Sequence, residues 1–110
     1  MVYYYQYIHS NFLNGGNDMS DFDSCKKTPE GARDAGNEVE KIFINDCNIG
    51  YCRGCGVCNR THRCVQKDDM EEILNKMVAA DVIVMATPVY FYTMNGQMKI
   101  LIDRTVPRYE

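Results

Sequence analysis

The chain has 110 residues, of which 45% are hydrophobic and 25% are charged, and its formal net charge is −3. This composition is ordinary for one globular domain and gives no reason to expect nucleic acid as a partner. No apolar run approaches the roughly 20 residues that a membrane-spanning helix needs, and the first residues lack a signal-peptide pattern. We therefore expect a cytoplasmic protein without membrane contact, whose six cysteines serve metal or redox chemistry rather than a disulfide framework.

The first half of the chain predicts two strands and a helix between them. Residues 2–8 are rich in tyrosine, which favours a strand, although four tyrosines fit poorly in the centre of a parallel sheet. Thr28 and Pro29 resemble an N-cap followed by a first-turn proline, so they predict a helix over 28–35 that stops at Gly36. Two turns is short for a helix, so an earlier start is left open. Residues 38–45 predict the second strand.

A cysteine-rich segment, residues 47–67, follows the second strand. Four of its cysteines have the spacing C-x2-C-x2-C-x5-C, and they are Cys52, Cys55, Cys58 and Cys64. Steps of three residues cannot share one face of a strand, and Gly54 and Gly56 argue against a helix. The spacing therefore predicts a loop that draws its sulfur atoms together. Cys25 and Cys47 lie outside this motif, and we expect them to be small buried hydrophobic residues.

Three uses of these thiols compete. A [4Fe–4S] cluster comes first, because the spacing resembles a ferredoxin run and because residues 51–67 contain cations and no carboxylate. Zinc comes second, with His62 as an alternative ligand to one of the cysteines. A thiol–disulfide redox function comes last, since Cys52-x2-Cys55 has the redox spacing but leaves two cysteines unexplained.

The last third of the chain predicts a helix, a strand and a second helix. Residues 68–80 have Asp68 as N-cap, with Glu71 completing a capping box. One face of this helix carries the apolar stripe Met70, Ile73, Leu74, Met77 and Val78. Residues 82–86 predict a strand buried on both faces, and 87–96 a loop. A final helix, 98–105, ends before Pro107.

The order of these elements predicts an α/β fold with a doubly wound parallel sheet, of which about three strands are present. Ligands of such sheets bind beyond the carboxyl ends of the strands. The loop after residue 8 and the loop 87–96 would open there, and the cysteine-rich loop leaves the same edge because it too follows a strand. We treat residues 1–110 as a single domain.

The sequence resembles the NADPH-dependent FMN reductase and iron–sulfur flavoprotein family, which is flavodoxin-like. The resemblance covers about 31–108 and depends on residues 31–40, the cysteine motif, Lys67-Asp68-Asp69-Met70, Thr87-Pro88-Val89-Tyr90-Phe91 and the stretch from Gln97 to Arg104. It implies non-covalently bound FMN, with Tyr90 and Phe91 bordering the isoalloxazine ring. In iron–sulfur members the cysteines hold a [4Fe–4S] cluster close to a flavin, often across a dimer. The cofactor-binding residues implied are Pro88, Val89, Tyr90, Phe91, Thr93, Asn17 and Ser20.

Two departures from the family pattern stand out. The family's phosphate loop follows its first strand, but residues 1–30 are divergent, and only Gly16-Asn17 fits that loop, while Asp18 places a carboxylate where a hydroxyl is expected. The family sheet has five strands, so the chain is expected to be a truncated version of the fold. A short sheet with exposed edges also favours a homo-oligomer.

The resulting hypothesis is an FMN-dependent NAD(P)H oxidoreductase or electron-transfer flavoprotein with a [4Fe–4S] cluster. Its partners would be flavin and nicotinamide small molecules and a redox partner protein. The alternative is a non-enzymatic module that binds zinc or an iron–sulfur cluster and has a non-functional flavin site. No acid–base pair stands out, and hydride transfer does not require one.

Overall fold

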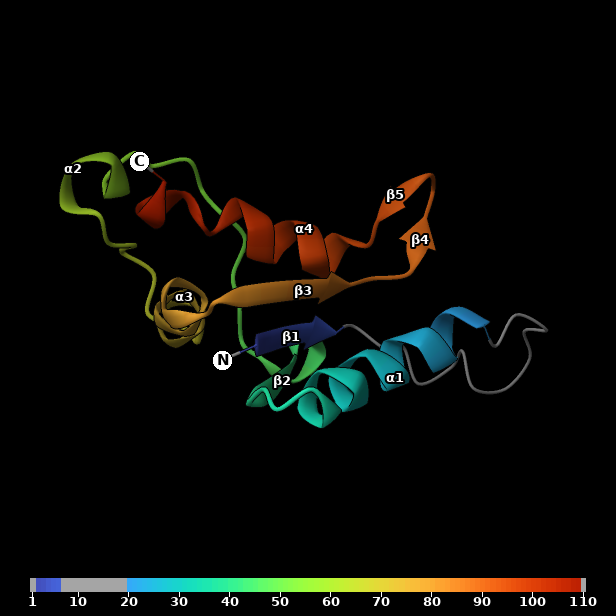
Figure 1. Ribbon diagram of the computed structural model, residues 1–110. Coiled ribbons are helices and arrows are strands. Elements are labelled where there is room, and N and C mark those ends of the chain that lie inside the picture. The colour runs from blue at the N-terminus through green and yellow to red at the C-terminus, as the bar shows by residue number, and fades with distance from the viewer. Residues whose placement is uncertain (1, 7–19, 110) are drawn as a thin grey trace.

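The computed structural model describes residues 2–6 and 20–109 (Figure 1). The strands are β1 (Val2–Gln6), β2 (Val39–Phe43), β3 (Val82–Ala86), β4 (Val89–Tyr90) and β5 (Thr93–Met94). The helices are α1 (Ser20–Asp34), α2 (Cys58–Thr61), α3 (Met70–Ala79) and α4 (Gly96–Asp103), and two 3₁₀ turns cover Ile44–Asp46 and Val106–Arg108. No helix within the described residues has the length and apolar character needed to cross a membrane.

The main sheet has three parallel strands in the order β2-β1-β3. Gln6, at the end of β1, is in register with Phe43 of β2 and Ala86 of β3, so the three carboxyl ends meet at one edge. The tyrosine-rich strand is therefore central, and the expectation that it fits poorly there is wrong. Backbone pairing on both sides decides its position, and tyrosine has ample β propensity. Helix α1 covers one face of the sheet and α4 the other (Figure 1).

Helix α1 is longer than the sequence predicts. It begins at Ser20 rather than at Thr28, and Pro29 lies buried inside it. An interior proline removes one backbone hydrogen bond, but α1 packs on β1 and β2, and this packing outweighs the local start signal. The predicted stop is confirmed: Gly36 has φ +90°, and its N–H donates to Arg33 O at 2.9 Å while Asn37 N–H donates to Ala32 O at 3.1 Å. These two bonds form a Schellman motif.

The core joins β2, α3 and α4. Its buried hydrophobic residues are Ile42, Ile44, Met70, Ile73, Leu74, Met98 and Leu101. Cys47 is half-buried against this cluster, close to the prediction, whereas the side chain of Cys25 lies outside the described part of the structure. The predicted stripe on α3 fails at Val78, which is 67% exposed. The buried positions of α3 lie mainly in its first half, so its last turn extends beyond the core.

Strand β3 was predicted to be buried on both faces, and this is wrong for the described structure. Val82, Ile83 and Met85 are all exposed. The cause is topological, because β3 is an edge of the described sheet and has a neighbour on one side only. Its apolar sequence suits a strand flanked by neighbours, so the described unit is a partial version of a wider sheet.

Candidate functional site

The cysteine loop contains two left-handed glycines and one helical turn. Gly54 has φ +65° and Gly56 has φ +72°, conformations that favour glycine. The absence of helix predicted for the loop is wrong for Cys58–Thr61, which forms α2. This turn comes after both glycines and ends at His62, where φ is +52° and the N–H donates to Cys58 O at 2.8 Å. The glycines therefore prevent helix formation only over the first half of the motif.

All four motif cysteines line one cavity of about 220 Å³, which we call the cysteine cavity. Cys52 and Cys55 are exposed, and Cys58 and Cys64 are half-buried. The end of α4 and the segment after it form another part of the wall, through Asp103, Arg104, Val106 and Pro107. Pro107 thus lies inside a 3₁₀ turn rather than simply ending a helix. The four cysteine side chains therefore border a common space, and their convergence on a metal stays a prediction.

The four cysteines border an open space and do not surround a single metal-sized point. Within the described residues, no compact group of three or more histidine, cysteine, aspartate or glutamate side chains is placed to hold one metal ion. His62, the alternative zinc ligand, lines a smaller neighbouring pocket together with Cys64 and does not line the cysteine cavity. The donor set available inside the cavity is therefore four thiols.

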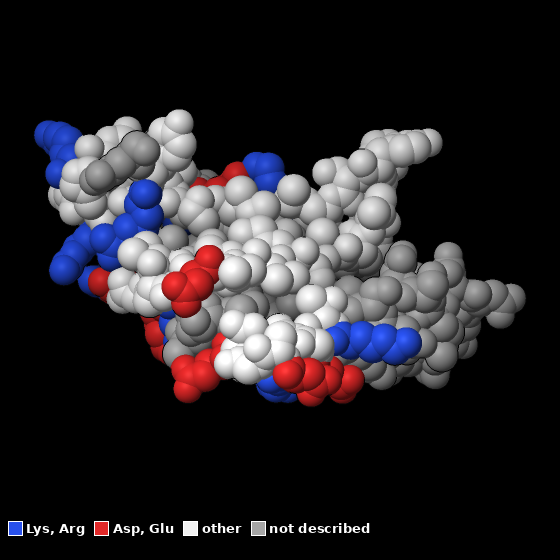
Figure 2. All heavy atoms as spheres, viewed as in Figure 1, with Lys and Arg blue, Asp and Glu red and all other residues white. Residues whose placement is uncertain are grey.

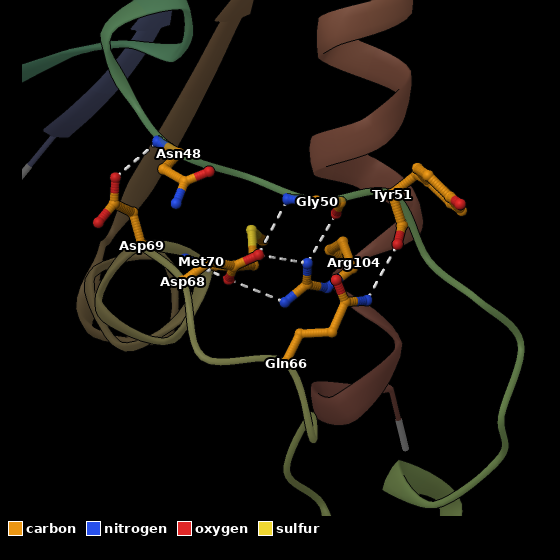
Figure 3. Close-up of polar contacts among 8 residues, drawn as sticks. All are labelled: Asn48, Gly50, Tyr51, Gln66, Asp68, Asp69, Met70 and Arg104. Atoms are coloured by element: carbon orange, nitrogen blue, oxygen red, sulfur yellow. Dashed lines mark hydrogen bonds and ion pairs between the residues drawn. The ribbon is translucent and has the colours of Figure 1, made fainter.

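Hydrogen bonds tie the two ends of the loop together at its base (Figure 3). Before the cysteines, Asn48 N–H donates to Asp69 Oδ2 at 2.6 Å, and Asp69 N–H donates back to Asn48 O at 3.0 Å. Gln66 Nε2 donates to Tyr51 O at 2.9 Å. These contacts, between residues 48–51 and 66–70, form what we call the loop base. The loop base fixes where the cysteine motif leaves the fold and where it returns.

Arg104, at the end of α4, completes the loop base. Its side chain is 2% exposed and forms a bidentate ion pair with Asp68, through Nη1 to Oδ2 at 2.7 Å and Nη2 to Oδ1 at 3.0 Å. Nη1 also donates to Gly50 O at 2.7 Å. Burial by itself would raise the pKa of Asp68, but hydrogen bonds from Arg104, Gly50 N–H and Met70 N–H outweigh it and hold that pKa below its usual value.

The predicted start of α3, with Asp68 as N-cap of a capping box, is only partly correct, because the helix runs over Met70–Ala79 and its N-cap residue is Asp69. Asp68 Oδ1 does accept the N–H of Met70, the first helical residue, at 3.1 Å. Glu71, however, is exposed, and its carboxylate accepts no hydrogen bond from Asp68 N–H among the described residues. The carboxylate of Asp68 is instead committed to Arg104 and to Gly50 N–H, which donates to Oδ2 at 2.9 Å. A tertiary ion pair has replaced the reciprocal cap.

Positive charge gathers at the end of the molecule that holds the cysteines. In Figure 2 Lys and Arg side chains lie over and beside α2, at the left of the view. The loop contributes Arg53, Arg60, Arg63 and Lys67 to this end. A group of thiolates would carry negative charge, and these cations would lower its energy.

The segment after β3, predicted to be a loop, folds into a hairpin. Strands β4 and β5 pair antiparallel, with Tyr90 opposite Thr93, so Phe91 and Tyr92 form a two-residue turn. Both turn residues have positive φ, 46° and 67°, which is the pattern of a type I′ turn and normally favours Asn-Gly. Both rings are 94% exposed and meet edge to face, with centroids 5.6 Å apart. We call this the aromatic hairpin.

The hairpin is anchored to the start of α4 by Asn95 and Thr87. Asn95 is 1% exposed, and its Oδ1 accepts the N–H of Met98 at 3.0 Å, as an N-cap does. Thr87 Oγ1 donates to Asn95 Oδ1 and accepts from Asn95 N–H, both at 3.1 Å. The two ends of the hairpin are therefore held together by the hydrogen bonds between Thr87 and Asn95. The helix begins at Gly96, two residues before the predicted start at 98.

The flavin-binding residues implied by the family resemblance are only partly within the described structure. Pro88 is half-buried, whereas Val89, Tyr90, Phe91 and Thr93 are exposed on the aromatic hairpin and its strands. Ser20 is the first residue of α1, and Asn17 lies outside the described residues.

Comparison with known proteins identifies the family. Residues 24–110 match the family model described as NADPH-dependent FMN reductase. This chain belongs to that family. The match confirms the resemblance seen in the sequence, and the flavodoxin-like α/β fold expected from it is confirmed as well.

Several relatives of the chain are iron–sulfur flavoproteins. One, from Archaeoglobus fulgidus, is 40% identical over 92 residues, which are 84% of this chain and 40% of the relative. Another, from Methanosarcina thermophila, is 43% identical over 77 residues, 70% of this chain and 40% of the relative. A solved flavone reductase aligns with a TM-score of 0.65 and 27% identity over 98% of this chain and 31% of that structure. The chain thus spans about 40% of the length of each of these two curated relatives.

Within the family fold, the two candidate regions of this chain lie at opposite ends of α4. The aromatic hairpin precedes the helix, and the segment after it lines the cysteine cavity (Figure 1). The expectation that the cysteine loop shares the strand edge with loop 87–96 is only half right. The loop does leave β2 at that edge, but residues 47–51 run back, so the cysteines lie near the far end of α4, about 12 Å of helix away.

Sequence reasoning missed the residues that hold these regions in place. No local sequence pattern marked Arg104 or Gly50 as part of the loop base, although Asp103-Arg104 was part of the family resemblance. Asn95 directly precedes the final helix, and its preference for N-cap positions was the available clue. Arg104 reaches a residue 54 positions away in the sequence, and no local pattern encodes such a contact.

Proposed function

We propose that this chain forms the cluster-binding part of an FMN-dependent electron-transfer flavoprotein. Cys52, Cys55, Cys58 and Cys64 would hold a [4Fe–4S] cluster, and the aromatic hairpin would border the flavin. The observation that carries the proposal is the cysteine cavity, because four thiols border one space of about 220 Å³. A space of this size around four thiols suits a group of several metal atoms better than a lone ion.

A bound cluster would supply one-electron chemistry, and a flavin would accept a hydride or trade single electrons. The chain's own contribution is positional. The loop base fixes both ends of the motif, Gly54 and Gly56 let the backbone curl, and the cations of the loop offset thiolate charge. The half-buried Cys58 and Cys64 keep part of the site away from water.

The relatives' names support this proposal, since the proteins from Archaeoglobus fulgidus and Methanosarcina thermophila are called iron–sulfur flavoproteins. We further propose NAD(P)H as electron donor and a single domain as the folded unit. A homo-oligomer is also part of the proposal, because the hairpin and the cavity lie at opposite ends of α4. A second copy could bring the hairpin of one chain to the cavity of another.

The first experiment is purification without oxygen, followed by an absorption spectrum and assays of iron, sulfide and zinc. We expect a broad brown shoulder and equal amounts of iron and sulfide. Cys58→Ala should remove the shoulder, whereas the control Cys47→Ala should retain it, because Cys47 packs against the core and does not line the cavity. A colourless protein that releases zinc on acid treatment would contradict the cluster and favour the zinc module.

The flavin is tested separately. Titration of the chain with FMN should quench flavin fluorescence, and Phe91→Ala with Tyr92→Ala should weaken binding. Tyr109→Ala is the matched control, since Tyr109 is similarly exposed, at 86%, but follows the cysteine end of α4. Unchanged FMN affinity in the hairpin variant would refute the role of the hairpin and leave the cluster proposal standing.

A further inference from the structure

Arg104 stands between a carboxylate and the cysteine cavity. On one side its two Nη groups pair with Asp68 in a bidentate arrangement. On the other it forms part of the cavity wall with all four motif cysteines. The planar guanidinium is always charged, and its 2% exposure keeps bulk water from screening it on the protein side.

One donor of Arg104 is left over. Nη1 and Nη2 serve Asp68 and Gly50 O, but the buried Nε–H has no hydrogen-bond partner among the described residues. A buried donor without a partner is unusual and calls for an acceptor. The cavity offers one in Cys64, which lines it together with Arg104.

The other charged groups of the cavity wall are less well placed. Arg53 lies in the exposed part of the loop. Asp103 is negative, but Lys99, one turn earlier on α4, is paired with it. Of the charged residues that line the described cavity, Arg104 is the buried one, and charge acts most strongly where water is excluded.

We propose that Arg104 is a positioning residue for the cluster, and that its buried guanidinium, hydrogen-bonding toward the Cys64 sulfur, raises the cluster's reduction potential. This inference rests on the cluster proposed above. Reduction adds one electron, and therefore one negative charge, to a group that is already negative. A fixed cation and a hydrogen bond to a ligand sulfur stabilise the reduced form more than the oxidised form.

The test is a redox titration of the iron- and sulfide-loaded chain with dithionite, followed by electron paramagnetic resonance. Arg104→Met should lower the midpoint potential, by the equivalent of about a tenfold change in the reduction equilibrium, or about 59 mV for one electron. Arg104→Lys keeps the charge and should recover most of the shift. Arg108→Met is the control, because Arg108 is exposed, bonds to Asn75 and does not line the cysteine cavity.

Arg104→Met leaves Asp68 buried without its partner, which destabilises the fold. A second variant therefore tests the inference without an unpaired buried charge. Asp68→Asn combined with Arg104→Gln removes both charges and retains groups that can hydrogen-bond with Gly50, and its potential should fall in the same direction by a smaller amount. An unchanged potential in this loaded double variant, or an equal fall in Arg108→Met, would overturn the role of Arg104. Wild-type protein without iron and sulfide would instead refute the cluster proposal, and this inference with it.

Discussion

The two ends of helix α4 differ in the burial and in the polarity of the residues around them. At its C-terminal end Arg104 is 2% exposed and held by an ion pair and a backbone carbonyl, beside a cysteine loop with several cations. At its N-terminal end the aromatic hairpin carries two rings that are 94% exposed, on a turn with two non-glycine residues in the left-handed region. One end is stabilised by buried polar contacts, and the other presents apolar surface at a cost in backbone energy.

Under the proposed function, the two ends of the helix would have different roles. A site that must hold a charged group needs fixed charges and defined loop ends, which the loop base supplies. A surface that receives a planar ring needs accessible aromatic faces, which burial would remove. Each prediction below either disturbs one end and leaves the other intact, or compares the two directly.

The largest effect is expected from breaking the buried ion pair. Arg104→Met leaves the Asp68 carboxylate buried and unpaired, and we expect it to lower the free energy of unfolding by about 3–5 kcal/mol. Urea unfolding monitored by circular dichroism measures this. The matched control is Lys99→Met, which breaks the more exposed pair with Asp103 on the same helix and should cost less than about 1 kcal/mol. Equal losses in the two variants would show that burial does not distinguish the pairs.

The hairpin should respond in the opposite direction. Replacing Phe91 by Asn and Tyr92 by Gly supplies the residues that a type I′ turn prefers, so the free energy of unfolding should rise by about 1–2 kcal/mol. The same urea experiment measures it, and FMN affinity should fall in parallel. A destabilised variant would mean that the rings contribute more through contacts than the turn loses through strain.

A smaller effect is expected at Gly50 of the loop base. A Cβ atom there would lie 2.6 Å from Gln66 Oε1, so Gln66 must move and lose its bond to Tyr51 O. We expect Gly50→Ala to cost about 1 kcal/mol, with a smaller cost in a Gln66→Ala background, as a double-mutant cycle would show. Gly31→Ala in α1, where no atom lies within 4 Å of the new Cβ, should be neutral or stabilising. Equal costs in both backgrounds would contradict the proposed clash.

The smallest expected effect is a dependence on acid pH. Because the pKa of Asp68 is lower in the folded chain than its usual value, its contribution to stability is complete above the unfolded pKa of about 3.9. That contribution is lost as the pH falls through the folded pKa. At pH values below about 4, the urea midpoint of the wild-type protein should therefore fall with decreasing pH more steeply than that of Asp68→Asn. Parallel curves for the two proteins would remove Asp68 from the acid response.

Local patterns predicted much of this molecule. The three strands of the main sheet, the stop of α1 at Gly36 and the α/β order follow from short-range preferences, which a sequence displays directly. The spacing of the four cysteines also predicted a common site, because ligand spacing is a local property. The predictions that Val78 and β3 are buried were wrong, because burial depends on which neighbours are present.

Taken alone, the amino-acid sequence predicted a common site for the four thiols and determined what class of fold carries them. Tertiary structure decided that the cysteine cavity and the aromatic hairpin occupy opposite ends of α4, and that Arg104 closes the loop base. The physical reason is sequence separation: Arg104 meets Gly50 across 54 positions and Asp68 across 36. Such pairs depend on how helices pack against the sheet, and no pattern within one segment encodes them.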